Sequence, residues 1–389
     1  MKGQADIMTE NTKIPSFELK RNYARVKEEI NVAIMRVLES QQFILGPEVD
    51  ALEKEIAAYL EVKNTVACAS GTDALMLAMT ALDLKPGDEV ITTPFTFFST
   101  VSCITRCGAT PVFVDVDPTT YNIKVEDVLA KITPRTKAVL PVHLFGQMCP
   151  LEKISGELKE RGITLVEDCA QAMGSHRIIE GHVAHCGSVG DMGCFSFFPT
   201  KNLGCYGDGG MVSVADNPEL AARLTRLRVH GAGETYYHEE VGFNSRLDAM
   251  QAAILRVRLR HLEGWNEERR IVADRYMKLF AEKGLLELVT PPAELAGGRH
   301  VYHQYVIRAK RRDDLQRFLA ERGITTRIYY PLALHLQHCF AYLGYKEGDF
   351  PNAEMLTHEV LALPMFPELL PEEQERVADG IAAFYSGKR

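Results

Sequence analysis

The chain has 389 residues and carries 44 Lys and Arg against 52 Asp and Glu, which gives a formal net charge of −8. This acidic balance argues against a nucleic-acid-binding protein, because such proteins present a net basic domain or a basic stripe. No apolar run approaches the roughly 18 residues of a membrane-spanning helix. The nine cysteines are scattered without CxxC pairs, so we expect reduced thiols and no disulfide framework.

The N-terminal segment is polar and lacks the apolar stretch of a secretory signal. We therefore expect a cytoplasmic protein, and Met8 is a second candidate for its natural start. With this length and 46% hydrophobic residues, the chain is expected to form two domains.

Apolar residues at helical spacing predict two N-terminal helices, over 24–40 and 47–60. Short runs rich in Val and Ile then alternate with helical patterns, which is typical of a mostly parallel sheet covered by helices on both faces. The sequence thus predicts an α/β fold. The expected strands are 65–68, 89–92, 111–114, 138–142 and 164–166, and the expected helices between them are 73–81, 98–107, 125–132 and 151–161.

From about residue 217 the pattern changes to long helices, over 218–229 and 248–283. The length of the second helix indicates a connector between domains. We expect a large α/β domain over 14–260 and a smaller α+β domain over 261–389. The elements expected in the smaller domain are strand 302–307, helix 313–321, strand 325–329 and helix 372–385.

Three loops carry polar residues just after an apolar run, where open parallel sheets bind ligands. In the first loop, Gly71 and Thr72 follow strand 65–68 and begin a helix. Free amides and hydroxyl groups at a helix start suit a phosphate, although the same residues can serve only as a helix cap. Neither GxxxxGK[ST] nor GxGxxG is present, which argues against nucleotide hydrolysis and a dinucleotide fingerprint.

The second loop follows strand 164–166 and begins with two acids, Glu167 and Asp168. Side chains alternate along a strand, so only one of the two acids faces the ligand crevice. A carboxylate at that position can hold a cationic nitrogen or a metal ion, and the alternative is a helix cap.

The third loop places Lys201 after an aromatic run and among Pro and Gly residues. A lysine in an apolar, partly desolvated pocket has a depressed pKa and becomes a nucleophile for Schiff-base formation. Together with the phosphate site, Asp168 and Ser196, it meets the needs of pyridoxal phosphate, which are phosphate binding, an anion at the ring nitrogen and an amine for the aldehyde.

The ordered set of motifs resembles the DegT/DnrJ/EryC1/StrS family of sugar aminotransferases, in the fold type I, aspartate aminotransferase-like superfamily. The resemblance extends over nearly the whole chain after residue 14, and it implies a mostly parallel sheet between helices with a smaller C-terminal domain. The matching motifs are FILGPEV at 43–49, SGTDAL at 70–75, EDCAQA at 167–172, SFFPTKNLG at 196–204, GFNSRLDAMQAA at 242–253 and YYPLALH at 329–335.

The resemblance also implies roles for individual residues. Lys201 would hold the cofactor aldehyde and carry the proton, and Asp168 would pair with the pyridinium nitrogen. Asn244 would reach the cofactor phosphate from the neighbouring subunit, which implies a homodimer with active sites at the subunit interface. The remaining cofactor contacts would be Gly71, Thr72 and Ser196 at the phosphate, Phe97 on the ring face and Gln171 at the ring hydroxyl or face.

Relatives that are dehydratases carry histidine in place of the lysine, so Lys201 favours transamination. The implied reaction moves the amino group of L-glutamate to a nucleotide-linked keto sugar. The preferred substrates are a UDP-linked 3-keto-N-acetylhexosamine or its uronic acid, or a dTDP-linked 3-keto-6-deoxyhexose, and a 4-keto sugar is the alternative. Arg327, Tyr330 and His335 are the expected substrate contacts.

Two other classes of function stay open from the sequence. His176, His182, His185 and Cys186 crowd into one Gly-rich segment, but they lack a fixed ligand spacing, so we expect exposed loop histidines and no metal site. A protein that keeps the pyridoxal-phosphate fold as a non-catalytic regulator or binding module is the second alternative. We expect no nucleic-acid or membrane partner.

Overall fold

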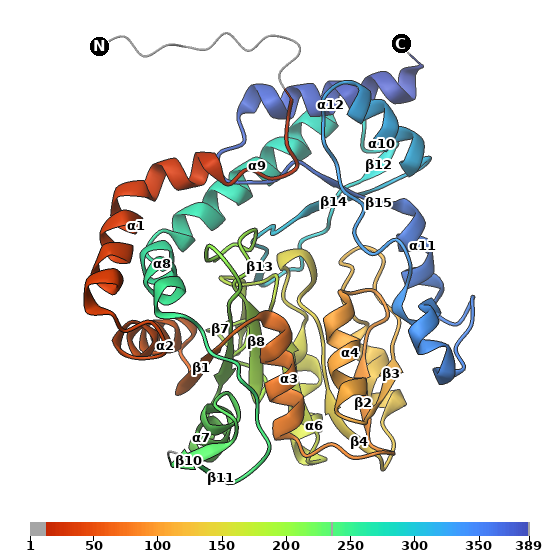
Figure 1. Cartoon of the computed structure of the whole chain (residues 1–389). Coiled ribbons are helices and arrows are strands. Elements are labelled where there is room, and N and C mark those ends of the chain that lie inside the picture. Colours follow the sequence, from red (N-terminus) through yellow and green to blue (C-terminus); the bar gives the residue numbers. More distant parts are fainter. Residues whose placement is uncertain (1–12, 235, 388–389) are drawn as a thin grey trace.

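A seven-stranded sheet forms the centre of the computed structural model, which describes residues 13–234 and 236–387 (Figure 1). The strand order is β1-β9-β8-β5-β4-β2-β3, and β9 runs antiparallel to its neighbours β1 and β8 while the other pairs are parallel. This largely parallel sheet confirms the predicted α/β class. The strands are β1 (Asn64–Cys68), β2 (Glu89–Thr92), β3 (Thr110–Phe113), β4 (Thr136–Val139), β5 (Thr164–Asp168), β8 (Met192–Ser196) and β9 (Gly210–Val214).

Successive residues of each central strand pack against opposite layers of helices. In β5, Val166 belongs to the core under α3, α4 and α7, whereas Leu165 belongs to the core under α5 and α6. Both faces of the sheet are therefore covered, which explains why most positions of these strands are buried and apolar. The covering helices are α2 (Pro47–Leu60), α3 (Gly71–Ala81), α4 (Phe98–Arg106), α5 (Val125–Val128), α6 (Ser155–Glu160), α7 (Pro218–Leu227) and α8 (Ala249–Leu259).

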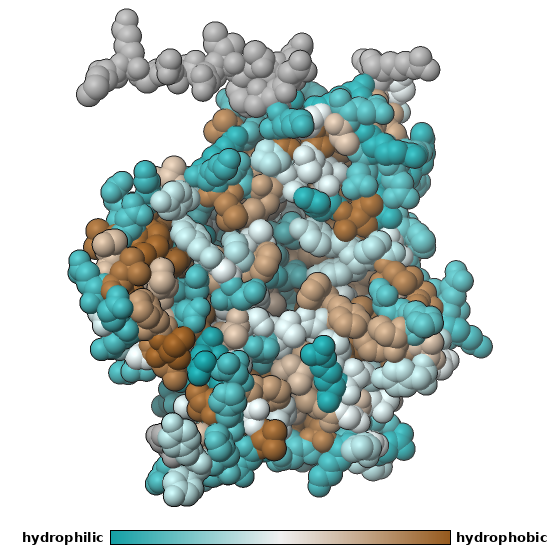
Figure 2. All heavy atoms as spheres, in the orientation of Figure 1, coloured by the Kyte–Doolittle hydropathy of each residue, from teal (hydrophilic) through white to brown (hydrophobic). Residues whose placement is uncertain are grey.

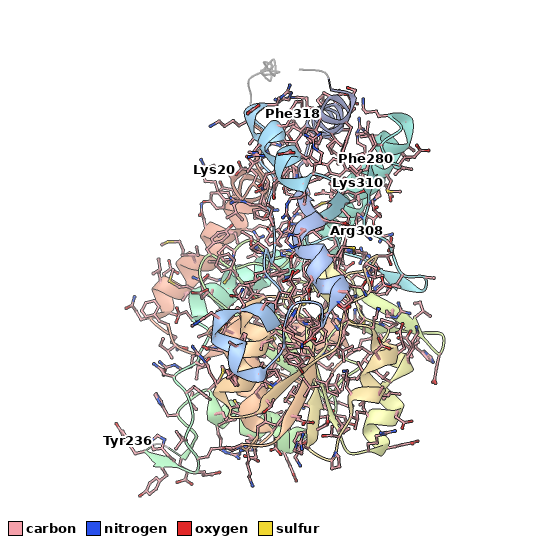
Figure 3. The ribbon with its side chains drawn as sticks, turned by 90° about the vertical axis from the view of Figure 1, so that its right-hand side faces the viewer. Lys20, Tyr236, Phe280, Arg308, Lys310 and Phe318 are labelled. Carbon is pink, nitrogen blue, oxygen red and sulfur yellow. The ribbon has the colours of Figure 1, made fainter. Side chains whose placement is uncertain are left out.

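The C-terminal part has its own apolar core around a three-stranded antiparallel sheet. The long helix α1 (Lys20–Ser40) packs against α8, and its first turn contacts the C-terminal part through the ion pair of Arg21 with Glu373. Figure 3 shows Phe318 and Phe280 in the C-terminal part, at the end of the molecule opposite Tyr236. The C-terminal elements are α9 (Leu262–Glu282), β12 (Val289–Thr290), β14 (Tyr305–Ala309), α10 (Arg312–Glu321), α11 (Pro351–Glu359), β15 (Val360–Leu363) and α12 (Pro371–Ser386).

The predicted helix 248–283 is wrong as a single helix, because the chain turns between α8 and α9. Arg258 lies in the last turn of α8 and His261 lies in the turn, directly before α9. Both pack on Trp265: the guanidinium carbon of Arg258 is 4.7 Å from a ring centroid, and the His261 ring stacks at 5.5 Å. The predicted domain boundary at residue 260 falls at this turn, and the division into two domains stays a prediction.

Two further predictions differ from the structure. Segment 325–329 is not a strand, since it pairs with β15 only at the single bridge between Arg327 and Ala362. The segment expected to be a histidine-bearing loop forms a hairpin of β6 (His176–Ile179) and β7 (His182–His185), to which β13 (Gly298–Arg299) adds a third strand.

No helix among the described residues is long and apolar enough to pass through a lipid bilayer. The predictions made for Met8 and the N-terminal segment concern residues outside the described ranges.

Candidate active site

The turn between β1 and α3 forms a cradle of hydroxyl and amide groups. Ser70 caps the helix, because its Oγ accepts a hydrogen bond from a backbone amide of the first turn at 3.1 Å. A Cβ atom on Gly71 would lie 2.5 Å from Cβ of Ser196, so this turn lies directly against the end of β8. Thr72 donates from Oγ1 to Oγ of Ser99 at 3.1 Å. The predicted phosphate residues therefore meet at a helix N-terminus, where an anion is stabilised.

Asp168 lies at the end of β5 and is 4% exposed. Its Oδ2 accepts a hydrogen bond from Oγ1 of Thr100 at 2.8 Å, and its Oδ1 accepts one from the Ala170 amide at 3.2 Å. Burial raises the pKa of Asp168, and the two hydrogen bonds oppose that shift. A cation placed beside this carboxylate would hold it in the charged form.

Glu167 points to the opposite side of the strand, as the alternation of side chains predicts. Its carboxylate contacts Nε2 of His143 at 2.7 Å and accepts hydrogen bonds from the amides of Gly187, Val189 and Gly190. Both residues are fully buried. Glu167 therefore ties the loop before β8 to the loop after β4, and only Asp168 is left for the crevice.

A buried cluster of possible ligand atoms surrounds Glu167. His143, Glu167 and Cys169 have nitrogen, oxygen and sulfur atoms within 4.8 Å of one another. The Cys149 amide donates to Nδ1 of His143 at 3.0 Å, so the ring proton sits on Nε2 and is directed at Glu167. The lone pair of Nδ1 is thus already used by the protein.

Lys201 lies in a turn after β8, and its backbone N–H donates a hydrogen bond to the carbonyl of Phe198 at 2.8 Å. Burial lowers the pKa of Lys201 from 10.5 to about 8, and the negative charge of Asp168 opposes the shift. The next residue, Asn202, anchors the turn, because its amide group contacts Nδ1 of His303 at 3.1 Å and donates to the carbonyl of Val301 at 3.1 Å. The backbone that carries Lys201 is therefore anchored, and the basicity of its side-chain amine is reduced.

Gln171 links this side of the crevice to the C-terminal part. Its Oε1 accepts a hydrogen bond from the Phe145 amide at 2.8 Å, and its Nε2 donates to the hydroxyl of Tyr330 at 2.7 Å. Tyr330 was predicted as a substrate contact, and the structure places it against a predicted cofactor residue.

Two adjacent phenylalanines begin α4 and have different environments. The Phe98 ring stacks on Phe340 with centroids 5.5 Å apart. The Phe97 ring is 59% exposed, although it is large and apolar. Of the two, Phe97 is the one free to stack on a ligand.

The predicted role of Asn244 concerns the site of a neighbouring subunit and stays a prediction. Asn244 is exposed, and it forms a backbone bridge with Val229. The predicted substrate contacts Arg327 and His335 do not join the residues described above. Arg327 is exposed at the bridge to β15. His335 is 1% exposed and its Nε2 contacts Glu354 at 3.0 Å, which leaves it no open surface for a substrate.

His176 and His185 of the β6–β7 hairpin are partly buried, in contrast to the exposed loop that was expected. The rings of His176 and His185 pack together with centroids 5.9 Å apart, and burial lowers the pKa of both. His182 is exposed, and Cys186 is buried with its Sγ donating to the carbonyl of Ala172.

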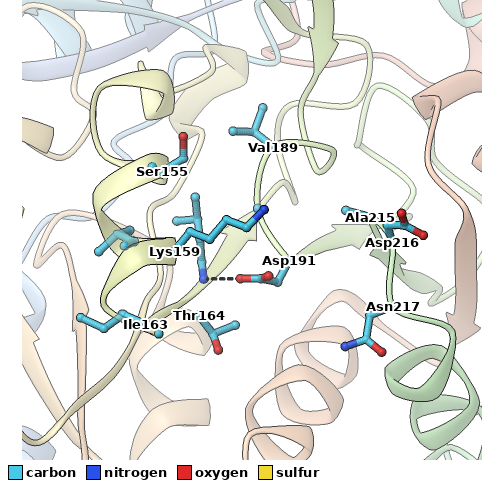
Figure 4. A pocket seen from close by; sticks show the side chains of 14 residues that line it. Ser155, Lys159, Ile163, Thr164, Val189, Asp191, Ala215, Asp216 and Asn217 are labelled. Carbon is cyan, nitrogen blue, oxygen red and sulfur yellow. Dashed lines mark hydrogen bonds between the residues drawn. The ribbon is translucent and has the colours of Figure 1, made fainter.

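A spacious cleft lies at the other end of the sheet (Figure 4). Its volume is about 630 Å³, and it is lined by the start of β5, α6 and the residues before α7. Asp191 accepts a hydrogen bond from the Leu165 amide there at 2.8 Å, and Lys159 points across the cleft. Because β5 begins beside this cleft and ends at Asp168, the cleft is separated from the Lys201 group by the length of a strand.

The sequence did not single out Thr100 or Ser99, which hold Asp168 and Thr72. Both lie in the first turn of α4, directly after Phe97 and Phe98. The signal that the sequence offers for them is the hydroxyl-rich motif TFFST at 96–100, in which only Phe97 is predicted to contact the cofactor.

Comparison with known proteins agrees with this geometry. A model of the DegT/DnrJ/EryC1/StrS aminotransferase family matches residues 24–382. The chain is 50% identical to a "pleiotropic regulatory protein" of Geobacillus stearothermophilus, over 96% of this chain and 98% of the relative. It is 46% identical to a UDP-N-acetyl-3-dehydro-alpha-D-glucosamine 3-aminotransferase of Acidithiobacillus ferrooxidans, over 95% of this chain and 98% of the relative.

Solved structures show the same fold. The crystal structure of DesV from S. venezuelae, in complex with a ketimine intermediate, superposes with a TM-score of 0.91 at 40% identity and covers 96% of this chain and 98% of DesV. Other solved neighbours were obtained with pyridoxamine phosphate or pyridoxal phosphate bound.

Proposed function

Because the chain belongs to the DegT/DnrJ/EryC1/StrS aminotransferase family, we propose that it transfers the amino group of L-glutamate to a nucleotide-linked 3-keto sugar. The observation that carries the proposal is Lys201, an amine of depressed pKa that faces the charge of a buried Asp168 beside an anion cradle. The A. ferrooxidans relative, whose name specifies amination of a 3-dehydro sugar linked to UDP, supports the choice of carbon.

The residues of the crevice fit pyridoxal 5′-phosphate, the cofactor of this family. The phosphate would lie in the cradle of Gly71, Thr72 and Ser196, where the close approach of two backbones leaves no room for a Cβ at residue 71. Phe97 would cover the ring face. When bound, the cofactor supplies an aldehyde carbon and an electron-withdrawing ring.

Lys201 is the residue that moves protons. With a pKa of about 8, its Nζ is neutral in about one molecule in ten at pH 7. It can therefore take a proton from the amine-bearing carbon of glutamate and, in the second half of the reaction, give a proton to the carbon of the sugar that gains the amine.

Asp168 fixes the charge opposite the ring nitrogen. Its burial makes an isolated carboxylate unfavourable, so a cationic partner is strongly preferred in this position. Thr100 and the Ala170 amide each donate to a different oxygen of the carboxylate, and each oxygen keeps a further acceptor position for that partner.

A homodimer is part of the proposal. Figure 2 shows apolar side chains gathered over α1 and α2, on the face of the molecule that carries the loop between these helices. Such a large exposed apolar surface is typical of a protein interface. Asn244 is exposed and could complete the phosphate site of a second copy. The exposed apolar residues of this patch are Val32, Met35, Leu38, Phe43 and Ile44.

The test is incubation of the purified protein with L-glutamate and a panel of UDP- and dTDP-linked 3-keto and 4-keto sugars, with NMR identification of the aminated carbon. We expect a 3-amino sugar and 2-oxoglutarate. Amination at C4 would overturn the choice of sugar while the aminotransferase chemistry stands.

A regulatory role is the second candidate, favoured by the name of the relative at 50% identity. The two roles differ in whether glutamate changes the bound cofactor. We expect addition of glutamate to shift the visible absorbance of the holoprotein. In Lys201→Ala we expect this absorbance to be absent. A holoprotein whose spectrum ignores glutamate and every keto sugar would support the regulator.

A further inference from the structure

The amide of Gln171 is held in one orientation by two groups from different parts of the chain. The backbone N–H of Phe145 can only donate, so the atom that it contacts at 2.8 Å is the oxygen Oε1. The nitrogen Nε2 therefore faces Tyr330, whose hydroxyl accepts one of its two hydrogens at 2.7 Å. The second hydrogen of Nε2 is then the one donor that the Gln171 side chain has left, beside a second lone pair on Oε1.

Both anchors have unusual backbone conformations. Phe145 has φ of 55° and Tyr330 has φ of 57°, the left-handed region that side chains with a Cβ rarely adopt. Strained residues of this kind persist where the surrounding structure holds them, and they cluster at functional sites. Here the two strained residues converge on the same glutamine.

Aromatic packing keeps the hydroxyl of Tyr330 in place. Its ring stacks on Phe145 with centroids 6.1 Å apart and planes 19° apart, and it meets Phe95 edge-on at 5.5 Å. Phe95 and Phe145 belong to loops after β2 and β4, whereas Tyr330 belongs to the C-terminal part. The tyrosine therefore fastens that part of the chain to the strand ends that carry Asp168 and Gln171.

We propose that Tyr330 is a positioning residue that, together with the Phe145 amide, turns Gln171 so that it donates a hydrogen bond to the ring oxygen of the cofactor. This assignment rests on the proposed function, and it moves Tyr330 from the substrate contacts to the support of the cofactor site. If the amide of Gln171 could flip, its Oε1 would face the ring oxygen, and the two negatively polarised oxygen atoms would repel each other.

The readout is the pH titration of the visible absorbance of the purified holoprotein. A donor to the ring oxygen stabilises its negative charge, so the adjacent Schiff-base nitrogen holds its proton less tightly. The pKa of the Schiff-base nitrogen therefore rises when the donor is removed or turns away. For one hydrogen bond, the expected shift in Tyr330→Phe is about half a unit to one unit.

Tyr329→Phe is the matched control, because the Tyr329 ring also packs on Phe145, at 6.2 Å. We expect its titration to coincide with that of the wild type. Gln171→Ala should show the upward shift by itself, and adding Tyr330→Phe to it should change nothing further.

Three results would overturn the assignment. An unchanged titration in Tyr330→Phe would show that the hydroxyl does not position the glutamine. A shift of equal size in the Gln171→Ala background would show that Tyr330 acts on the cofactor directly. A wild-type protein without visible absorbance after incubation with pyridoxal phosphate would remove the proposed function itself, which distinguishes that failure from the other two.

Discussion

Oγ1 of Thr100 donates a hydrogen bond to Oδ2 of Asp168 over 2.8 Å, and neither residue is more than 4% exposed. The bond joins the first turn of α4 to the end of β5, so the carboxylate that we propose as the partner of the ring nitrogen is fixed from outside its own strand. A hydrogen bond to a buried charged group is worth about 1.5–3 kcal/mol.

Replacing Thr100 by Val keeps the shape of the side chain and removes this donor. We expect the charged form of Asp168 to lose stabilisation, so that kcat falls about 10-fold or more while the protein stays folded. Thr100→Ser retains the hydroxyl and should keep activity close to the wild type. Equal losses in the two variants would show that the methyl group matters and the hydrogen bond does not.

The two adjacent acids, Glu167 and Asp168, should respond differently to loss of charge. Glu167→Gln disturbs a buried carboxylate that binds His143 and three amides, so we expect the free energy of unfolding to fall by about 2–4 kcal/mol. Asp168→Asn should leave that free energy nearly unchanged and reduce kcat about 100-fold or more, because the ring nitrogen loses its counter-ion. Denaturant titration and steady-state kinetics of both variants check this, and a reversed pattern would contradict the orientation of the strand.

The depressed pKa of Lys201 predicts the pH dependence of cofactor capture. Only the neutral amine attacks an aldehyde, and below the pKa the neutral fraction rises about tenfold for each pH unit. With a pKa of about 8, the rate of absorbance change on mixing apoprotein with pyridoxal phosphate should rise about tenfold from pH 6 to 7 and level off above 8. A rate that keeps rising toward pH 10 would show an ordinary lysine.

A methyl group at Gly71 should damage the phosphate cradle. Its Cβ would lie 2.5 Å from Cβ of Ser196, so Gly71→Ala must push the β1–α3 turn away from the end of β8. We expect the Kd of pyridoxal phosphate to rise about 10-fold or more. Gly264→Ala is the matched control, because a Cβ at that helical glycine meets open space. Unaltered cofactor affinity in Gly71→Ala would place the phosphate elsewhere.

The sequence predicted the parts of the fold and site that depend on local pattern. Asp168 ends a buried strand and Gly71 and Lys201 follow one, and parallel strands carry such residues to one edge of the sheet. The contact of Gln171 with Tyr330 spans 159 residues and depends on how the C-terminal part packs, which no local pattern records. The role of Thr100 could not be predicted from the sequence, because a threonine in a buried helix has the same local pattern as any small core residue.

Errors in the predicted elements have similar causes. Helical periodicity continues on both sides of the turn between α8 and α9, so the turn at residues 260–261 leaves no trace in the pattern of apolar residues. Segment 325–329 has the composition of a strand, yet it makes one bridge and then leads to Tyr330, whose left-handed backbone turns the chain toward the crevice. In both cases tertiary packing decides the structure.

Reduction of the holoprotein with sodium borohydride, followed by digestion and mass spectrometry, shows whether Lys201 is the amine that holds the cofactor aldehyde. We expect a pyridoxyl adduct on the peptide that contains Lys201 and on no other lysine peptide. A reduced adduct on a different lysine, or none in a protein that still catalyses transamination, would contradict this expectation.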